Sequence, residues 1–352
     1  MKKFIKTALI ILFILIVILI IIPSPIDPAS YSPAQAKELS GVMSANTELQ
    51  KAQLLAKGQI NGPEETAFNS QGVLCGGTQD GDIKCIYPNN EIKVLTNTDG
   101  RPLGMQFDRE GNLIVCDAYK GLLSINKKGE ITVLANTVDG VDFKFTDALD
   151  IASDGTIYFT DASSKYKQTE YLYDLLESRP YGRFMRYDPS TKKVTVLIDK
   201  LYFANGVALS QNEDFVLINE TYRYRIVKYW LKTAKQGTHE IFIDNLPGFP
   251  DNINSNGHGT FWLALFTVRN KMIDKNHPSV FIKSLISKLP KMFWPKAKPY
   301  GLVISLNEEG EITKSLHDPS GKHLREITSA KEHKGYLYLG SLHNDRIGKY
   351  KL

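Results

Sequence analysis

The sequence predicts an all-β fold, a six-bladed β-propeller with an N-terminal membrane anchor helix. Three observations support this prediction. A unit of about four strand-like runs recurs along the chain, oversized connections fall at equivalent points of two units, and an oxygen-bearing side chain recurs where the first strand of a unit begins. Units of four strands repeated around an axis are typical of propeller blades.

The unit is clearest between Leu201 and Asn252. A short strand carries Asn205, three further strand-like runs follow, and the next unit begins with a strand that carries Asp251. Alternating apolar residues and β-favouring composition support these runs as strands. The other units begin near residues 64, 103, 146 and 324.

The last unit has three strands before the chain ends. An open blade would expose unpaired backbone groups, so we expect Leu49–Gly58 to supply the fourth strand and close the ring. The alternative for this segment is a short helix, since Ala, Gln, Lys and Leu favour helix. The predicted organisation is an anchor at 1–27, a proline-containing spacer at 28–48 and a propeller at 49–352.

The N-terminus has the pattern of a signal anchor. Lys2, Lys3 and Lys6 precede an apolar run from Ala8 to Ile22, and no small-residue cleavage site follows it. We expect a single-pass protein with a cytoplasmic N-terminus and an extracytoplasmic propeller. A cleaved signal peptide is the alternative, and it also exports the propeller.

Charge and cysteine content restrict the function classes. The net charge of +5 is concentrated at the N-terminus and in residues 269–300, where eight Lys and Arg face one acid, so nucleic-acid binding is not expected. Cys75 and Cys85 flank a turn and are candidates for a disulfide, but buried thiols are an equal interpretation.

Two long connections, at about 162–182 and 267–300, each join the second and third strands of a unit. Such loops emerge on the face where first strands begin, so we expect both to cover the channel mouth as lids. Residues 279–294 combine helically spaced apolar residues, including Phe281 and Leu285, with lysines. They fit either a helix that contacts membrane lipid or a helix packed on the domain surface.

Four oxygen-bearing residues begin first strands: Glu64, Asp147, Asn205 and Asp251. Propeller symmetry directs these positions toward the central channel, where carboxylate and amide oxygens suit one divalent cation, with Ca²⁺ favoured. Each residue alone also fits ordinary turn or surface chemistry, and the recurrence in register supports the joint assignment.

Several motifs resemble the strictosidine-synthase-like branch of the gluconolactonase and paraoxonase superfamily of six-bladed propellers. They are Gly62–Glu64, Gly100–Gly104, Asp117–Leu122, Ile157–Ser164, Gly182–Asp188, Tyr202–Leu209, Glu220–Arg225, Asn245–Asn252 and Leu337–Leu342. The resemblance implies one calcium-type ion in the channel, with Glu64, Asn205 and Asp251 at ligand positions. It also implies a condensing Glu in the sixth blade, whereas this chain has Thr328 near that position.

The leading functional hypothesis is therefore a metal-dependent hydrolase of small lactones or esters. A channel cation can polarise a carbonyl group, and Asp251, His343 or His323 can transfer protons. Candidate substrate-binding residues on mouth loops are Tyr119, Tyr222 and Arg223. The alternatives are a non-enzymatic binding propeller with a structural ion and, third, a condensing synthase, which Thr328 disfavours.

Overall fold

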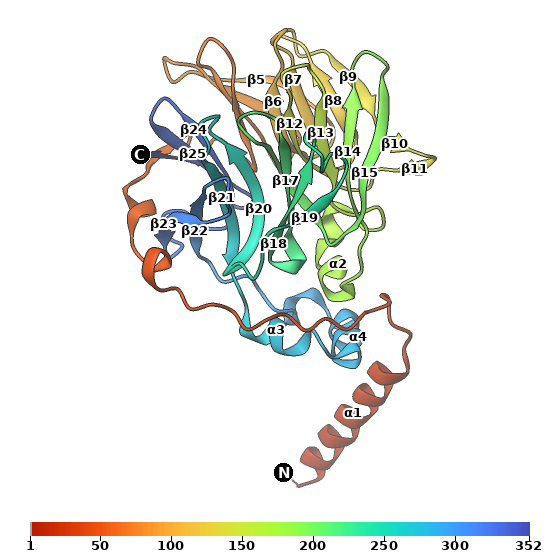
Figure 1. Ribbon diagram of the computed structural model, residues 1–352. Helices are drawn as coiled ribbons and strands as arrows, with labels where there is room; N and C mark the ends of the chain where they lie inside the picture. The colour runs from red at the N-terminus through yellow and green to blue at the C-terminus, as the bar shows by residue number, and fades with distance from the viewer. Residues whose placement is uncertain (1) are drawn as a thin grey trace.

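The computed structural model describes residues 2–352, apart from the side chains of residues 2, 8, 9, 11, 12, 14–16 and 18. Six four-stranded antiparallel sheets surround a central channel, so the predicted six-bladed propeller is confirmed (Figure 1). In five blades the strand nearest the channel comes first in the chain and the outermost comes last. In the sixth blade the outermost strand comes from near the N-terminus.

The first three blades have the following strands: β2 (Thr66–Phe68), β3 (Leu74–Gly77), β4 (Asp82–Ile86) and β5 (Ile92–Asn97); β6 (Pro102–Phe107), β7 (Leu113–Asp117), β8 (Gly121–Ile125) and β9 (Ile131–Ala135); β12 (Thr146–Ile151), β13 (Ile157–Asp161), β14 (Gly182–Asp188) and β15 (Lys193–Leu201). Blades two and three are joined by a small hairpin that the sequence did not predict, with strands β10 (Thr137–Val138) and β11 (Val141–Asp142).

The last three blades have these strands: β16 (Ala204–Leu209), β17 (Phe215–Glu220), β18 (Arg225–Trp230) and β19 (His239–Ile243); β20 (Gly248–Ser255), β21 (Phe261–Val268), β22 (Gly301–Leu306) and β23 (Ile312–Asp318); β24 (Ile327–His333), β25 (Tyr336–Ser341), β26 (Ile347–Lys351) and β1 (Gln53–Leu55).

The ring closes through β1, which pairs antiparallel with β26, so the predicted closure by the segment after Leu49 is confirmed. The alternative helix is present as well, because η2 (Glu48–Lys51) is a 3₁₀ helix immediately before the strand. Leu49 and Ala52 are buried in an apolar cluster that includes residues of blades five and six. The closing segment therefore contributes core packing in addition to backbone hydrogen bonds.

Among the described residues, the helices inserted into the blades lie at one end of the propeller. The first long connection contains η3 (Gln168–Glu170) and α2 (Tyr171–Glu177), and the second contains α3 (Lys271–Asn276), α4 (Val280–Lys288) and η5 (Lys291–Phe293). A short 3₁₀ helix, η4 (Thr221–Arg223), follows β17. Figure 1 shows α2, α3 and α4 below the ring, at the end from which the N-terminal helix extends. Both insertions thus lie on one face, as the sequence predicts.

The predicted spacer is bound to the propeller rather than free of it. It contains η1 (Gly41–Met43), whose Met43 is buried, and Ser315 Oγ donates a hydrogen bond to the Val42 carbonyl. Tyr31 lies under the Arg223 guanidinium, 3.7 Å from the ring centroid. We call residues 23–36 the strap, because they run along the lid helices.

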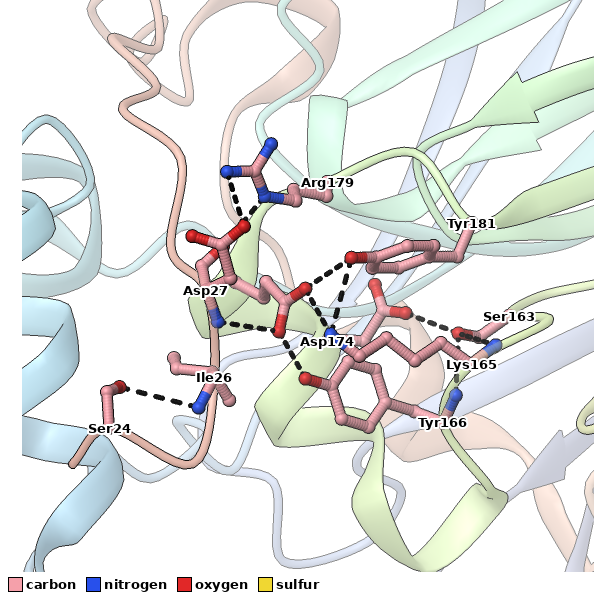
Figure 2. Close-up of polar contacts among 10 residues, drawn as sticks. Ser24, Ile26, Asp27, Ser163, Lys165, Tyr166, Asp174, Arg179 and Tyr181 are labelled. Atoms are coloured by element: carbon pink, nitrogen blue, oxygen red, sulfur yellow. Dashed lines mark hydrogen bonds and ion pairs between the residues drawn. The ribbon is translucent and has the colours of Figure 1, made fainter.

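The strap is held by Glu177, a buried carboxylate on α2. Figure 2 shows the surroundings of this contact, with Asp27 of the strap near Arg179, Tyr166 and Tyr181. Glu177 accepts hydrogen bonds from the Lys165 ammonium at 2.6 Å and from the hydroxyls of Tyr166 and Tyr181. Glu177 Oε2, which accepts the Tyr166 hydroxyl, also accepts the backbone N–H of Asp27 at 3.1 Å. These donors hold the pKa of Glu177 below its usual value despite burial, so the carboxylate is ionised at neutral pH.

The N-terminal helix, α1 (Lys2–Ile21), leads into the strap and contacts α4, where Lys288 Nζ donates to the Leu19 carbonyl at 3.1 Å. The apolar run from Ala8 to Ile22, on which the anchor prediction depends, falls largely on side chains outside the described residues. Within the part of the chain that the structure does describe, no helix has the length and apolar character needed to cross a membrane.

Candidate functional site

The four predicted ligands line a single cavity of about 370 Å³ at the helix-bearing end of the channel. These residues are Glu64, Asp147, Asn205 and Asp251, one from each of blades one, three, four and five. All four are nearly buried, with exposures of 2–8%. The structure therefore brings together residues that are up to 187 positions apart in the sequence (64 to 251).

Irregular pairing in the inner strands directs these side chains toward the channel. The register between first and second strands shifts between Thr146 and Leu149, between Ala204 and Val207, and between Pro250 and Ile253. Asp147, Asn205 and Asp251 lie inside these three bulges. A bulge leaves residues out of the regular ladder and turns a side chain that would otherwise alternate with its neighbours.

Close approach of neighbouring blades fixes the backbone at the same points. A Cβ on Gly206 would lie 2.5 Å from the Asp251 carbonyl oxygen, so only glycine fits where β16 meets β20. The Asn205-Gly206 pair is thus a contact between blades and not the turn pair that remained an alternative. The Asp251 carbonyl also accepts a hydrogen bond from the Asn219 amide, which positions it further.

Three buried oxygen atoms in the cavity have no hydrogen-bond partner among the described residues. They are Glu64 Oε2, Asn205 Oδ1 and Asp251 Oδ1. Buried polar atoms in folded proteins are nearly always paired, so three on one cavity indicate a missing partner. The other Glu64 oxygen, Oε1, accepts the Asn252 side-chain amide at 3.0 Å, which orients the carboxylate.

The electrostatics of the cavity also favour a cation. Burial, followed by repulsion from Asp147 and Asp251, raises the pKa of Glu64 well above its usual value. Burial raises the pKa of Asp147 in the same direction, and that of Asp251 to about 8. Arg101 acts in the opposite sense on Glu64 and Asp147. A bound divalent cation would favour the ionised carboxylates far more strongly.

The residues fit a hard cation, although their present side-chain positions do not form a finished coordination shell. Among the residues described, no group of three His, Cys, Asp or Glu side chains is arranged to hold a metal ion. The set includes an amide, Asn205, and its unpaired atoms are oxygens, which is the ligand chemistry that Ca²⁺ and Mg²⁺ prefer. The unpaired oxygens carry the assignment of the site here.

His343 is the predicted proton-transfer histidine that lines the cavity. Its Nδ1 lies 2.8 Å from Glu326 Oε2, and Glu326 lines the cavity as well. Sequence analysis missed Glu326, because it precedes β24 by one residue and belongs to no recurring pattern. No sequence signal marks it, because its φ of 49°, a backbone conformation uncommon outside glycine, is visible only in the structure.

His323 does not reach the cavity, so its assignment as a proton-transfer residue is wrong in position. Its Nε2 is 2.8 Å from the Ala52 carbonyl, and its backbone N–H donates to Asp318. The side chain thus contacts the segment that closes the ring. The sequence position of His323 predicts the cavity-bearing face of blade six. The direction of its side chain depends on the closing segment, which the imidazole ring contacts.

The three predicted substrate-binding residues differ in their positions. Tyr222 lines the cavity and donates its hydroxyl to the Tyr171 carbonyl at 2.9 Å. Tyr119 lies outside the cavity and contacts it only through Gln168, whose Oε1 accepts the tyrosine hydroxyl at 3.1 Å. The Arg223 guanidinium is enclosed by the rings of Tyr31 and Tyr202, so it supports the strap and does not face a ligand.

Thr328 lines the cavity, and its hydroxyl donates to the Glu64 backbone carbonyl at 2.6 Å. A threonine that bonds a neighbouring main chain positions Glu64 and offers no acid for condensation chemistry. Most of the remaining wall is apolar and comes mainly from the lids and mouth loops; its apolar residues include Leu103, Phe145, Leu172, Leu175, Phe203, Phe249, Phe266, Ile273 and Trp294.

The fold and the cavity define a six-bladed propeller with buried carboxylates at the base of a channel cavity, and solved propellers share this fold. A gluconolactonase from Xanthomonas campestris aligns with a TM-score of 0.63 and 16% identity, over 94% of this chain and 99% of that one. Regucalcin from Agrobacterium tumefaciens, described as a calcium-binding protein, aligns with a TM-score of 0.58 and 12% identity, over 87% and 93% of the two chains.

Sequence comparison defines the family more closely. Residues 41–86 match the N-terminal strictosidine synthase-like family, and residues 147–234 match the strictosidine synthase family. The adipocyte plasma membrane-associated protein of Rattus norvegicus is 38% identical over 95% of both chains. Strictosidine synthase-like protein 4 of Arabidopsis thaliana is 35% identical over 86% of this chain and 82% of its own. The chain belongs to the strictosidine-synthase-like family.

Proposed function

We propose that this protein is a membrane-anchored, extracytoplasmic hydrolase of lactones or esters that uses one divalent cation, with Ca²⁺ favoured. The observation that carries the proposal is the set of unpaired, buried oxygens on Glu64, Asn205 and Asp251 at the base of an apolar cavity. The names of the gluconolactonase and of the calcium-binding regucalcin are in keeping with it.

Glu64, Asp147, Asn205 and Asp251 would hold the ion, and an ion bound there supplies a Lewis acid that polarises a substrate carbonyl. Asn252, which bonds Glu64, would keep that ligand oriented. The apolar wall would bind the body of the substrate and exclude water from the reacting bond.

Proton transfer is assigned to His343, with Glu326 as its positioning residue. The Glu326 carboxylate accepts at Nδ1, which fixes that nitrogen as the protonated one and leaves Nε2 as the basic atom. From Nε2 the ring would take a proton from the attacking water and return it to the leaving alkoxide. In this scheme Asp251 serves as a cation ligand, and its carboxyl is the second group able to accept a proton.

The membrane part of the proposal depends on the outward side of α4. The helix buries Lys283 and Ser287 against the strap and α2, whereas Phe281 is 59% exposed and Val280 is 44% exposed. Met292 and Phe293, just beyond, are exposed as well. Ile286 packs against the lid, so only part of the apolar surface of α4 faces outward. Exposed apolar side chains at the start of a helix and just beyond its end suit a lipid interface. Several relatives are named plasma membrane-associated proteins, in keeping with this orientation.

An extracytoplasmic location agrees with the cysteines. Cys75 and Cys85 lie directly opposite each other on β3 and β4 and form a disulfide, while Cys116 is free and buried. Such a bond persists in oxidising compartments. The pairing that the sequence left open is therefore decided in favour of the disulfide.

The test uses the full chain in nanodiscs of neutral lipid. Aryl esters and aliphatic lactones are screened with calcium, with a chelator, and after calcium is restored. We expect turnover that the chelator abolishes and calcium recovers. Calcium-dependent thermal stabilisation without turnover of any ester or lactone would contradict the hydrolase and identify a binding propeller instead.

A further inference from the structure

The polarity of the cavity changes from its base to its rim, and this change restricts the chemical class of its ligand. Its base carries the buried carboxylates of blades one, three and five, and its walls are formed mainly by aliphatic and aromatic side chains. Its rim includes three exposed lysines, Lys291, Lys296 and Lys298, all from the second insertion. From base to rim, the cavity is thus polar, apolar and then basic.

The basic rim is not neutralised from within its own segment. Residues 269–300 contain a single acid, Asp274, and its carboxylate pairs with Arg269 at 2.9 Å and accepts the Tyr224 hydroxyl. Lys291 Nζ donates to the Thr169 carbonyl at 3.1 Å, which holds this ammonium at the meeting point of the two lids. The one acid on the opposite rim, Glu326, is engaged by His343.

The position of the rim also shows how a ligand would enter. Lys291 begins η5, whose Met292 and Phe293 are 72% and 65% exposed, and Trp294 then turns back into the cavity wall with 5% exposure. One short stretch therefore offers apolar side chains outward, lysines at the opening and an indole inside. A molecule with an apolar body and an anionic group matches this stretch, because its body suits the apolar side chains and its charge suits the lysines.

We propose that the ligand of this cavity is a single-chain anionic amphiphile, whose apolar chain lies along the aromatic wall and whose carboxylate or phosphate pairs with Lys296 and Lys298 at the rim. The inference rests on the proposed function only for the end that reaches the base, where a substrate would place its ester or lactone carbonyl. The cavity of about 370 Å³ lies in the range of small-molecule pockets, roughly 300–1,000 Å³.

Binding is measured first, with ligands that contain no scissile bond. The full chain in neutral-lipid nanodiscs is titrated with decanoate, decyl phosphate, decanol and inorganic phosphate, and Trp294 fluorescence is followed. A Trp294→Phe variant identifies the signal from that indole. We expect decanoate and decyl phosphate to bind at least about tenfold more tightly than decanol, and inorganic phosphate alone not to saturate the signal.

The matched variants test the rim. Lys296→Gln combined with Lys298→Gln should reduce the decanoate-to-decanol affinity ratio to about one, whereas Lys128→Gln, at an exposed turn of blade two, should keep the parent ratio. Equal affinity for decanoate and decanol in the parent would overturn the proposal. So would a ratio that is unchanged in the double variant, or saturation by inorganic phosphate with the same affinity as decyl phosphate.

A kinetic arm separates this inference from the proposed function. The 4-nitrophenyl monoester of octanedioic acid carries a terminal carboxylate, and 4-nitrophenyl octanoate is its neutral counterpart. If the hydrolase assignment holds, we expect the anionic ester to have the higher kcat/KM by about tenfold, and the double variant to lose that preference. A chain that binds anionic amphiphiles selectively but cleaves neither ester would overturn the hydrolase while supporting the ligand class. Cleavage of both esters at equal kcat/KM would support the hydrolase and overturn the anionic ligand class.

Discussion

Asp251 shows how one side chain depends on several weak local features at once. It lies in a bulge of β20, its carbonyl is bonded by Asn219, and the neighbouring strand approaches closely because residue 206 is glycine. Its side-chain Oδ1 is left unpaired by all of these contacts. The main chain of Asp251 is held firmly, while one carboxylate oxygen has no hydrogen-bond partner, which suits a residue that binds a ligand.

The substitution Asp251→Asn keeps the shape of this side chain and removes its charge. We expect calcium affinity to fall by about 100-fold or more, since a ligand should matter at least as much as the outer-shell partners that cost 10–100-fold. Turnover should be lost in parallel. Isothermal titration with calcium measures the affinity, and circular dichroism confirms the fold. Unchanged affinity in a folded variant would remove Asp251 from the ligand set.

The same carboxylate predicts a pH dependence for the metal-free protein. The pKa of Asp251 is about 8 in the fold, above its unfolded value of roughly 3.9, so the folded state binds more protons between these limits. Stability without metal should therefore decrease as the pH rises from about 4 to about 8, and less steeply in Asp251→Asn. Thermal unfolding in chelator across this range tests it; a parallel pH profile for variant and parent would contradict the shift.

Glu177 is the residue of the lid that holds the strap in place. Its carboxylate accepts from three side chains and one strap amide, so Glu177→Gln removes charged hydrogen bonds worth roughly 2 kcal/mol in total stability. The exposed Glu309→Gln serves as the matched control. The Asp27 N–H donates to the Glu177 carboxylate and the Ala29 N–H to the Glu177 main-chain carbonyl, so hydrogen exchange of both amides should be faster in the Glu177 variant. Equal protection in both variants would mean that the strap is held by other contacts.

At the scale of elements, the sequence allowed the strands to be predicted better than the helices. Strand runs repeat, so each copy checks the others, and the four ligand positions follow from the same repetition. The orientation of α4 had no such check. Its apolar spacing fits burial or exposure equally, and the outcome depends on Lys283, whose ammonium bonds the Ala29 carbonyl and Ser178 Oγ. Contacts between segments so far apart leave no local pattern.

The outward face of α4 predicts membrane binding without the anchor. The test protein lacks residues 1–22, which keeps the Ile26 and Asp27 contacts with the lid. We expect binding to anionic vesicles that weakens with salt, since each lysine near the surface contributes about 1 kcal/mol. Phe281→Ser with Leu285→Ser should weaken it again, whereas Val94→Ser, an exposed apolar residue of β5, should not. Equal binding by all three proteins would exclude α4 from the interface.

At the scale of the whole molecule, the ring joins the two ends of the propeller. β1 lies between β26 and solvent, and Leu49, with 0% exposure, packs into the cluster shared by blades five and six. The cation ligands come from four different blades, so their spacing depends on the closure of the ring. The sequence predicted the closing strand because an open edge is unfavourable. It could not predict the packing of the strap, which depends on polar contacts with the lids.

Leu49→Ala tests whether the ring unfolds as one unit. Removing a fully buried leucine costs about 2–5 kcal/mol, and the exposed Lys51→Ala provides a control of the same segment. If closure stabilises the whole propeller, hydrogen exchange should accelerate in the inner strands of all six blades, and calcium affinity should fall although no ligand has changed. If the closing segment stabilises only its own blade, faster exchange would be confined to β24–β26, and calcium affinity would match the control. That second result would contradict the dependence of the site on ring closure, because the ligands of blades one, three, four and five would then keep their spacing with the last blade loosened.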